Sequence, residues 1–299
     1  MISKVEKDYI SKGIAAGIRN DGRGPNESRQ LELETGIINQ ASGSCRVSVR
    51  GGTEVLVGIK VSVGDIQELD TRDEEEEAMK NRADVGRIVC SVECSPSAKI
   101  VLDKRQIEEM CILYTQILNR TLNGPQGGLD LYKLCIIPGS VCWILNIDVL
   151  ILNYGGSVFD AIFMAVRGAI HNTRLAKVKV ESTDGAFDFE VEDDETEVLE
   201  GRENVPVAVT AFQIDKNHVI DAMPLEEQCS DSSVSVMVNK HGKLCGVQKG
   251  LKGSLETSLL INMIQHCQNK GQEVISAMDS FLAQEERRII DLVEPVGFR

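Results

Sequence analysis

One stretch decides the fold of the first half of the chain: Arg46-Val47-Ser48-Val49-Arg50-Gly51-Gly52-Thr53-Glu54-Val55-Leu56-Val57-Gly58-Ile59-Lys60-Val61-Ser62-Val63. Apolar and polar residues alternate on both sides of the two glycines, and this period of two is typical of half-buried β-strands. A glycine pair allows the positive backbone angles that a tight turn requires. The stretch therefore predicts a β-hairpin.

Helical and strand patterns alternate on both sides of this hairpin. On its carboxyl side we expect a helix over 107–122, strands over 134–137 and 142–152, and a helix over 159–172. The second half repeats the order with strands over 205–214 and 218–222, a hairpin over 233–239 and 244–248, and a long helix over 255–290, which Gly271 could interrupt. The sequence therefore predicts a mixed α/β (α+β) protein of two similar strand-hairpin-helix modules that share a core.

The charge pattern suggests where the modules meet. Of the 299 residues, 46 are Asp or Glu and 32 are Lys or Arg, which gives a net charge of −14. Acidic residues concentrate in 70–77 and in 181–203, which we interpret as solvated loops, with an acidic docking surface as the alternative. We predict a helical extension at 1–20, a first module at 21–180, an acidic linker at 181–203 and a second module at 204–299.

The same composition limits the functional classes. No apolar run approaches the roughly 20 residues of a membrane span, and residues 1–10 lack the apolar region of a secretory signal, so we expect a soluble intracellular protein. The nine cysteines form no Cys-x-x-Cys pair, which favours reduced structural thiols over disulfides. We predict no bound metal and no cofactor. An acidic chain also lacks the basic face of a protein that binds nucleic acid alone.

Four motifs in sequence order resemble the ribonuclease PH family: Asp21-Gly22-Arg23 with Arg29 downstream, Gly43-Ser44 entering the hairpin, Asp148 to Ser157 leading into Asp160-Ala161, and Asn204 to Val209. The form of the third motif is similar to the branch of the family that contains exosome ring subunits. The resemblance implies a ribonuclease PH-like fold and assembly into heterodimers and rings around an RNA channel.

The resemblance also implies where catalytic residues would lie. Active members bind phosphate at a Gly-Gly-Thr-Arg turn, which corresponds to Gly155-Gly156-Ser157-Val158 and lacks the arginine. They carry an acid pair whose positions correspond to Glu227 and Ser233, and serine cannot act as a general acid. We interpret Glu226 and Glu227 as part of an exposed turn.

A third element of the family's apparatus is a pair of arginines that hold the RNA backbone from one face of a helix. Matching Glu109 to the family's glutamate places Ile112 and Gln116 at those two positions, so this phosphate clamp is absent. Because three parts of the apparatus are missing together, we predict no catalytic residue in this chain. The better candidates for contacts along an RNA path are Arg82, Arg87, Lys104 and Arg105, each of which could also be an ordinary surface residue.

The sequence therefore predicts a non-catalytic structural subunit of the exosome ring. Its expected partners are other ribonuclease PH-like subunits, cap subunits and RNA in the assembled channel, with no membrane. The resemblance implies a nuclear, nucleolar and cytoplasmic location. One alternative is a phosphorolytic 3′-to-5′ exoribonuclease that uses residues from a neighbouring subunit. Another is a stand-alone RNA-binding module, which the acidic charge disfavours.

Overall fold

The computed structural model describes residues 3–65, 85–98, 103–125, 127–183, 186–250 and 253–290. Its first sheet has the strand order β1-β2-β3-β6-β4, with β5 paired to β6. Strand β4 runs parallel to β6, and the other pairings are antiparallel. The strands of this sheet are β1 (Leu31–Thr35), β2 (Gly43–Val49), β3 (Thr53–Asp65), β4 (Arg87–Cys94), β5 (Cys135–Ile137) and β6 (Val141–Asn153).

Two helices complete the first module. Helix α2 (Lys104–Leu122) packs beside β4, and α3 (Val158–Asn172) packs against β2 and β3. Most of α3 is buried because its other side contacts β9 of the second module. The main hydrophobic cluster accordingly includes α3 and residues of both modules, such as Val57, Phe163 and Met237. The prediction of a shared core is confirmed.

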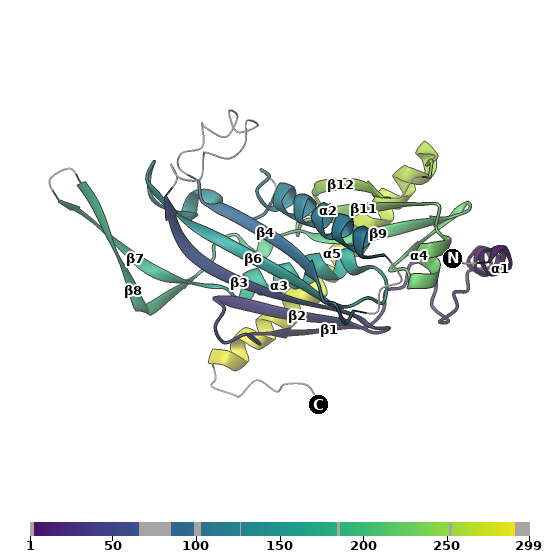
Figure 1. Ribbon diagram of the computed structural model, residues 1–299, viewed down its shortest axis with the longest axis horizontal. Coiled ribbons are helices and arrows are strands. Elements are labelled where there is room, and N and C mark those ends of the chain that lie inside the picture. Colours follow the sequence, from purple (N-terminus) through teal and green to yellow (C-terminus); the bar gives the residue numbers. More distant parts are fainter. Residues whose placement is uncertain are drawn as a thin grey trace.

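The second module is an antiparallel sheet covered by one long helix. Its strand order is β10-β9-β11-β12, formed by β9 (Val207–Ile214), β10 (Asn217–Ile220), β11 (Ser232–Val238) and β12 (Leu244–Gly250). Helix α5 (Thr257–Ile290) packs across β9 and β11 and continues beneath the first module (Figure 1). Gly271 does not interrupt α5, and a Cβ at this position would lie 3.3 Å from the Cβ of Val238.

Two shorter helices border the second sheet. Helix α4 (Pro224–Cys229) follows β10, and α1 (Lys4–Ala15) buries Ile10 and Ile14 against Phe212 and Ile214. Short 3-10 turns occur at Leu131–Leu134 and Arg202–Asn204. None of the helices among the described residues is long and apolar enough to cross a membrane.

The acidic segment 181–203 is not the solvated loop that the charge predicted. Most of it forms β8 (Ala186–Val198), which pairs with β7 (Arg174–Thr183) in a hairpin that projects from the two sheets (Figure 1). The acids alternate with Phe187, Phe189 and Val191, and this period of two is that of a strand. Lysines of β7 lie opposite the acids, and Lys177 bonds Glu195 at 2.9 Å. The other acidic block, 70–77, lies outside the described residues.

Candidate functional site

The base of the site is the turn between β6 and α3. A Cβ on Gly155 would lie 2.4 Å from the carbonyl oxygen of Gly51, and one on Gly156 would lie 2.3 Å from that of Ala222. Gly156 also has a φ of +87°, which an L side chain rarely adopts. Thr53 Oγ1 donates to the Gly156 carbonyl at 2.6 Å. The backbone of this turn is therefore fixed between the first hairpin and the segment that follows β10.

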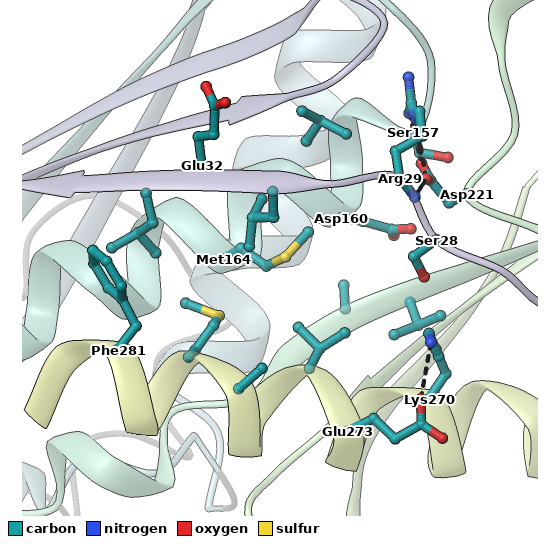
Figure 2. Close-up of a pocket in the computed structure, with 18 of the residues that line it drawn as sticks. Ser28, Arg29, Glu32, Ser157, Asp160, Met164, Asp221, Lys270, Glu273 and Phe281 are labelled. Carbon is teal, nitrogen blue, oxygen red and sulfur yellow. Dashed lines mark hydrogen bonds and ion pairs between the residues drawn. The ribbon is translucent and has the colours of Figure 1, made fainter. Parts of the chain in front are cut away.

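Arg29 joins the turn to the second module. Its Nη1 donates to the Gly155 carbonyl at 2.6 Å and its Nη2 to the Gly156 carbonyl at 3.0 Å. The same guanidinium binds the Asp221 carboxylate, with Nη2 to Oδ1 at 2.6 Å and Nε at 3.0 Å from each oxygen (Figure 2). Arg23 is a second cation at this carboxylate, with its Nη1 3.0 Å from Asp221 Oδ2. Burial alone would raise the pKa of Asp221, but the hydrogen bonds and charges of the two arginines hold that pKa below its ordinary value.

A second carboxylate occupies the amino end of α3. Glu227 Oε1 accepts the backbone N–H of Ser157 at 2.7 Å, and Glu227 Oε2 accepts the Tyr154 hydroxyl at 2.5 Å. Burial raises the pKa of Glu227, and the bonds from Tyr154 and Ser157 oppose that shift only in part. The free N–H groups and dipole at a helix amino end attract anions. Here the anion is a side chain of the protein itself.

The neighbouring Glu226 forms a buried ion pair. Arg19 Nε lies 2.9 Å from Glu226 Oε1, and Arg19 Nη2 lies 2.5 Å from Glu226 Oε2. Both side chains are almost fully buried, and Arg19 also donates to the carbonyl oxygens of Ile220 and Asp221. The prediction that Glu226 and Glu227 belong to an exposed turn is therefore wrong. The glutamates turn inward because Arg19 and the α3 amino end offer them buried donors.

A third buried acid, Asp160, lies in the first turn of α3. It accepts from the backbone N–H of Thr210 at 3.0 Å and from Thr210 Oγ1 at 2.6 Å. Burial raises the pKa of Asp160 to about 7, although the hydrogen bonds from Thr210 act in the opposite direction. This carboxyl group connects α3 to β9, and with a pKa of about 7 it changes protonation state near physiological pH.

Both modules match a known family. Residues 27–176 match the sequence model described as 3′ exoribonuclease family, domain 1, and residues 204–266 match the model for domain 2. The chain belongs to the 3′ exoribonuclease family. This confirms the ribonuclease PH resemblance.

Relatives within the 3′ exoribonuclease family cover nearly the whole chain. A Dictyostelium discoideum protein that carries the name exosome complex exonuclease RRP42 is 30% identical over 95% of this chain and 98% of its own length. The exosome complex component Rrp42 of Thermococcus gammatolerans is 32% identical over 99% of this chain and 97% of its own length.

Solved structures confirm the ribonuclease PH-like fold. An archaeal exosome core chain covers 92% of this chain and 96% of its own length, with a TM-score of 0.72 and 22% identity. A chain of the Archaeoglobus fulgidus exosome with RNA bound to the active site covers 91% of this chain and 97% of its own length, with a TM-score of 0.74 and 23% identity.

Four of the positions to which the resemblance assigns parts of the family's catalytic apparatus hold uncharged residues, whereas Glu227 keeps a carboxyl group. Val158, in place of the phosphate-binding arginine, is 2% exposed and packs in the core. Ser233 is buried on β11, and its Oγ lies close to Gly250 on β12. Ile112 and Gln116 are exposed one turn apart on α2, where they present no positive charge.

The candidates for an RNA path do not form one cluster. Arg82 lies outside the described residues, Arg87 begins β4, and Lys104 and Arg105 begin α2. Hydrogen bonds tie the carboxyl end of α2 to the start of β4, so Arg87 lies about 28 Å from the two basic residues at the amino end of α2, given the 1.5 Å rise per residue. Lys104 and Arg105 are exposed and approach Glu108 and Glu109 of their own helix. Their contact with RNA stays a prediction.

Sequence reasoning missed Arg19, Tyr154 and Asp221 as parts of the site. The one available signal for Arg19 was that it follows the apolar residues Ile14 and Ile18 at the end of the first helix. An arginine that is buried at such a place requires an acidic partner elsewhere in the chain. Burial raises the pKa of the Cys90 thiol to about 12. Within the described part of the chain, no three His, Cys, Asp or Glu side chains are placed to hold one metal ion.

Proposed function

We propose that this chain is a ring subunit of the RNA exosome that has no catalytic site of its own. It would support 3′-to-5′ RNA processing and degradation by forming part of the RNA channel and the interfaces to its neighbours. The proposal is supported by the family membership, by two relatives named as Rrp42 exosome proteins, and by the fold that it shares with exosome core chains.

The observation that carries the catalytic part of the proposal is the bond from Ser157 N–H to Glu227 at 2.7 Å. Phosphorolysis requires inorganic phosphate as the nucleophile, and the resemblance places that phosphate at the amino end of α3. A carboxylate that already occupies this end repels a phosphate and uses the donor that would bind it. The buried Val158 supplies no compensating cation.

The partners in this proposal are other ribonuclease PH-like ring subunits and cap subunits, with RNA passing through the assembled channel. The net charge of −14 is consistent with RNA contacts that are shared with neighbouring chains. The proposed location is the nucleus, the nucleolus and the cytoplasm, where exosome-type RNA processing takes place.

Native mass spectrometry of the tagged chain, purified gently from its own cells, tests the assembly. We expect a complex that contains several other ribonuclease PH-like chains. The same complex, rebuilt with Glu227→Gln, tests the chemistry by phosphate-dependent release of nucleoside diphosphates from RNA. We expect the rate to stay within about twofold of the unmodified complex, as it should for the exposed control Glu109→Gln.

The second candidate is a phosphorolytic exoribonuclease whose missing arginines come from a neighbouring subunit. Burial raises the pKa of Glu227, which is the direction of shift that a general acid requires. The name of the Dictyostelium relative points the same way. Loss of nucleoside diphosphate release in the Glu227→Gln complex, with full activity in Glu109→Gln, would establish this candidate in place of the first.

A further inference from the structure

The two edge strands of the first sheet differ in whether side chains bond their outward backbone groups. At the β4 edge, α2 supplies side chains that bond the outward backbone groups of the strand. Asn119 bonds both the N–H and the carbonyl of Cys90 at 2.8 and 3.3 Å. Asn123 does the same for Ile88, at 3.2 and 2.8 Å. Thr115 adds a bond to the Val92 N–H at 3.1 Å, so this edge is closed to another strand.

The β1 edge has no such cover. Arg50 donates to the Gln30 carbonyl, and Gly36 donates to the Ser44 carbonyl, so the even-numbered residues of this segment face β2. In an antiparallel ladder the residues between them direct their N–H and C=O groups to the other side. The outward groups of β1 therefore belong to Leu31, Leu33 and Thr35. Among the described residues, no backbone bond to a further strand is formed at this edge.

A cavity of about 940 Å³ lies along this open edge, between β1 and α5 (Figure 2). The chain from Leu31 to Ile37 lines it without a break, so main-chain atoms of β1 form one wall. The opposite side is apolar and includes Met164, Val274, Met278 and Phe281. The groove therefore offers a free strand edge and an apolar floor to the same ligand.

The charged side chains around the groove are mostly acidic. Arg29 and Lys270 are its cations, and both are already paired, Arg29 with Asp221 and Lys270 with Glu273 at 2.8 Å. The acids that line the groove are Glu32, Glu34, Asp160, Asp221, Glu273 and Glu285. Asp221 and Glu273 are the partners of these two cations, and the side chains of Glu32 and Glu34 lie on the opposite face of β1. The net excess of acids over the two faces favours a cationic ligand over the phosphates of RNA.

The two faces of β1 specify a pattern for the ligand. Leu31 and Leu33 point toward the apolar cluster of Val207 and Met278, whereas Glu32 and Glu34 point to the opposite face of the sheet because successive side chains alternate. A strand added beside β1 continues both faces. Its side chains over the leucines would be apolar, and those beside the glutamates would be basic.

We propose that the β1 edge and this groove bind an extended segment of a partner protein in which apolar residues alternate with Lys or Arg. The segment adds to the first sheet as a further strand, with main-chain hydrogen bonds to Leu31, Leu33 and Thr35. The groove extends to Arg29, Ser157 and Asp221 beside the amino end of α3. The bonds proposed for the added strand are made at Leu31, Leu33 and Thr35, so the proposal does not depend on whether that end is catalytic.

The test uses the purified full chain and a fluorescein-labelled nine-residue peptide of alternating Val and Lys, with binding followed by fluorescence anisotropy. Two further peptides carry N-methyl groups on their backbone nitrogens, one at the odd-numbered positions and the other at the even-numbered positions. A strand uses only one set of its N–H groups toward a neighbour. We therefore expect one methylated peptide to bind at least about tenfold more weakly and the other to bind within about twofold of the parent, since three hydrogen bonds are at stake.

Variants of the chain test the site itself. Ala277→Trp on α5 fills the groove and should weaken binding at least about tenfold, whereas the adjacent control Ser276→Trp, outside the lining, should leave binding within about twofold. Thr35→Pro removes one outward N–H and keeps the pairing with β2, and it should also weaken binding. Circular dichroism and thermal midpoints confirm that each variant is folded.

Several results would overturn the proposal: no binding at peptide concentrations up to about 1 mM, equal binding of the two methylated peptides, or equal binding by the two tryptophan variants. Self-association of the full chain that Ala277→Trp abolishes would assign the edge to a second copy and would also overturn it. Tighter binding of a single-stranded RNA than of the parent peptide, sensitive to Ala277→Trp, would show that the acidic groove selects the wrong class of ligand.

Discussion

Arg29 links the two modules, so its replacement should weaken the whole fold. Arg29→Gln removes the guanidinium that binds both oxygens of Asp221 and the carbonyl oxygens of Gly155 and Gly156. Among the residues that the structure describes, only Arg23 then remains as a side-chain partner of the carboxylate. Breaking one side of a buried ion pair costs about 3–5 kcal/mol. Since the Asp221 side chain is 13% exposed and keeps Arg23, we expect about 3 kcal/mol.

Urea unfolding of the full chain, followed by circular dichroism, measures this cost. With a slope of about 3 kcal/mol per molar urea for a chain of this size, the midpoint should fall by about 1 M. The matched control is Arg50→Gln, because Arg50 is exposed and its side chain makes one hydrogen bond, to Gln30. That control should move the midpoint by no more than about 0.2 M. A similar small shift in Arg29→Gln would refute the role of Arg29 as the link.

The pH dependence provides a second check on the same pair. The pKa of Asp221 in the folded chain lies below its ordinary value of 3.8. A lowered carboxylate pKa stabilises the fold above the unfolded-state pKa, and that contribution disappears as the pH falls through the folded-state value. The stability difference between the wild type and Arg29→Gln should therefore be full at neutral pH and should narrow below about pH 4. A difference that widens on acidification would contradict the ion pair as its source.

Three further predictions concern separate parts of the fold. Asn119→Ala should lower the unfolding free energy by about 1–3 kcal/mol and increase light scattering on warming, because it exposes the β4 edge, whereas Gln116→Ala on the exposed face of α2 should change neither. As the pH rises from 5 to 8, the unfolding free energy of the wild type should fall more than that of Asp160→Asn. The reason is that the folded chain holds a proton on Asp160, with a pKa of about 7, which the unfolded chain releases; parallel profiles of the two proteins would refute this. Gly155→Ala should prevent or strongly weaken folding, measured as soluble yield and thermal midpoint, because its Cβ would meet backbone atoms; Gly24→Ala, which meets only a flexible side chain, should be tolerated.

Long periodic elements could be predicted from the sequence. The helices α2, α3 and α5 and the hairpins β2–β3 and β11–β12 all occur within a few residues of their predicted bounds. Strands β1 and β4 were not predicted. Both lie at an edge of the sheet. Strand β1 has only five residues, and β4 pairs with β6 in parallel, a long-range contact that no local pattern encodes. The segment that forms β8 was interpreted as a solvated loop because of its many acidic residues, although apolar residues alternate with them.

The site was predictable in its position and only partly in its chemistry. The turn at Gly155-Gly156 and the doubtful acid at Glu227 were both identified from the sequence. Their relation was not, because the bond from Ser157 to Glu227 joins residues 70 positions apart. The burial of Glu226 was missed for the same reason, since its partner Arg19 lies 207 positions away. Local sequence indicates a charged turn, and only the packing of the modules decides whether that turn faces water.

The capped amino end of α3 also explains how such a fold can persist without a bound anion. A helix amino end has unpaired N–H groups and a partial positive charge, and a nearby carboxylate stabilises it by about 0.3–1 kcal/mol, and by more when partly buried. Glu227 places a carboxyl group of the chain at that end, and Tyr154 and Ser157 fix its position. Groups of the chain itself therefore hold the turn in place. An arginine at position 158 alone would not recreate a phosphate site, since Val158 is buried in the core and Glu227 would still occupy the donor.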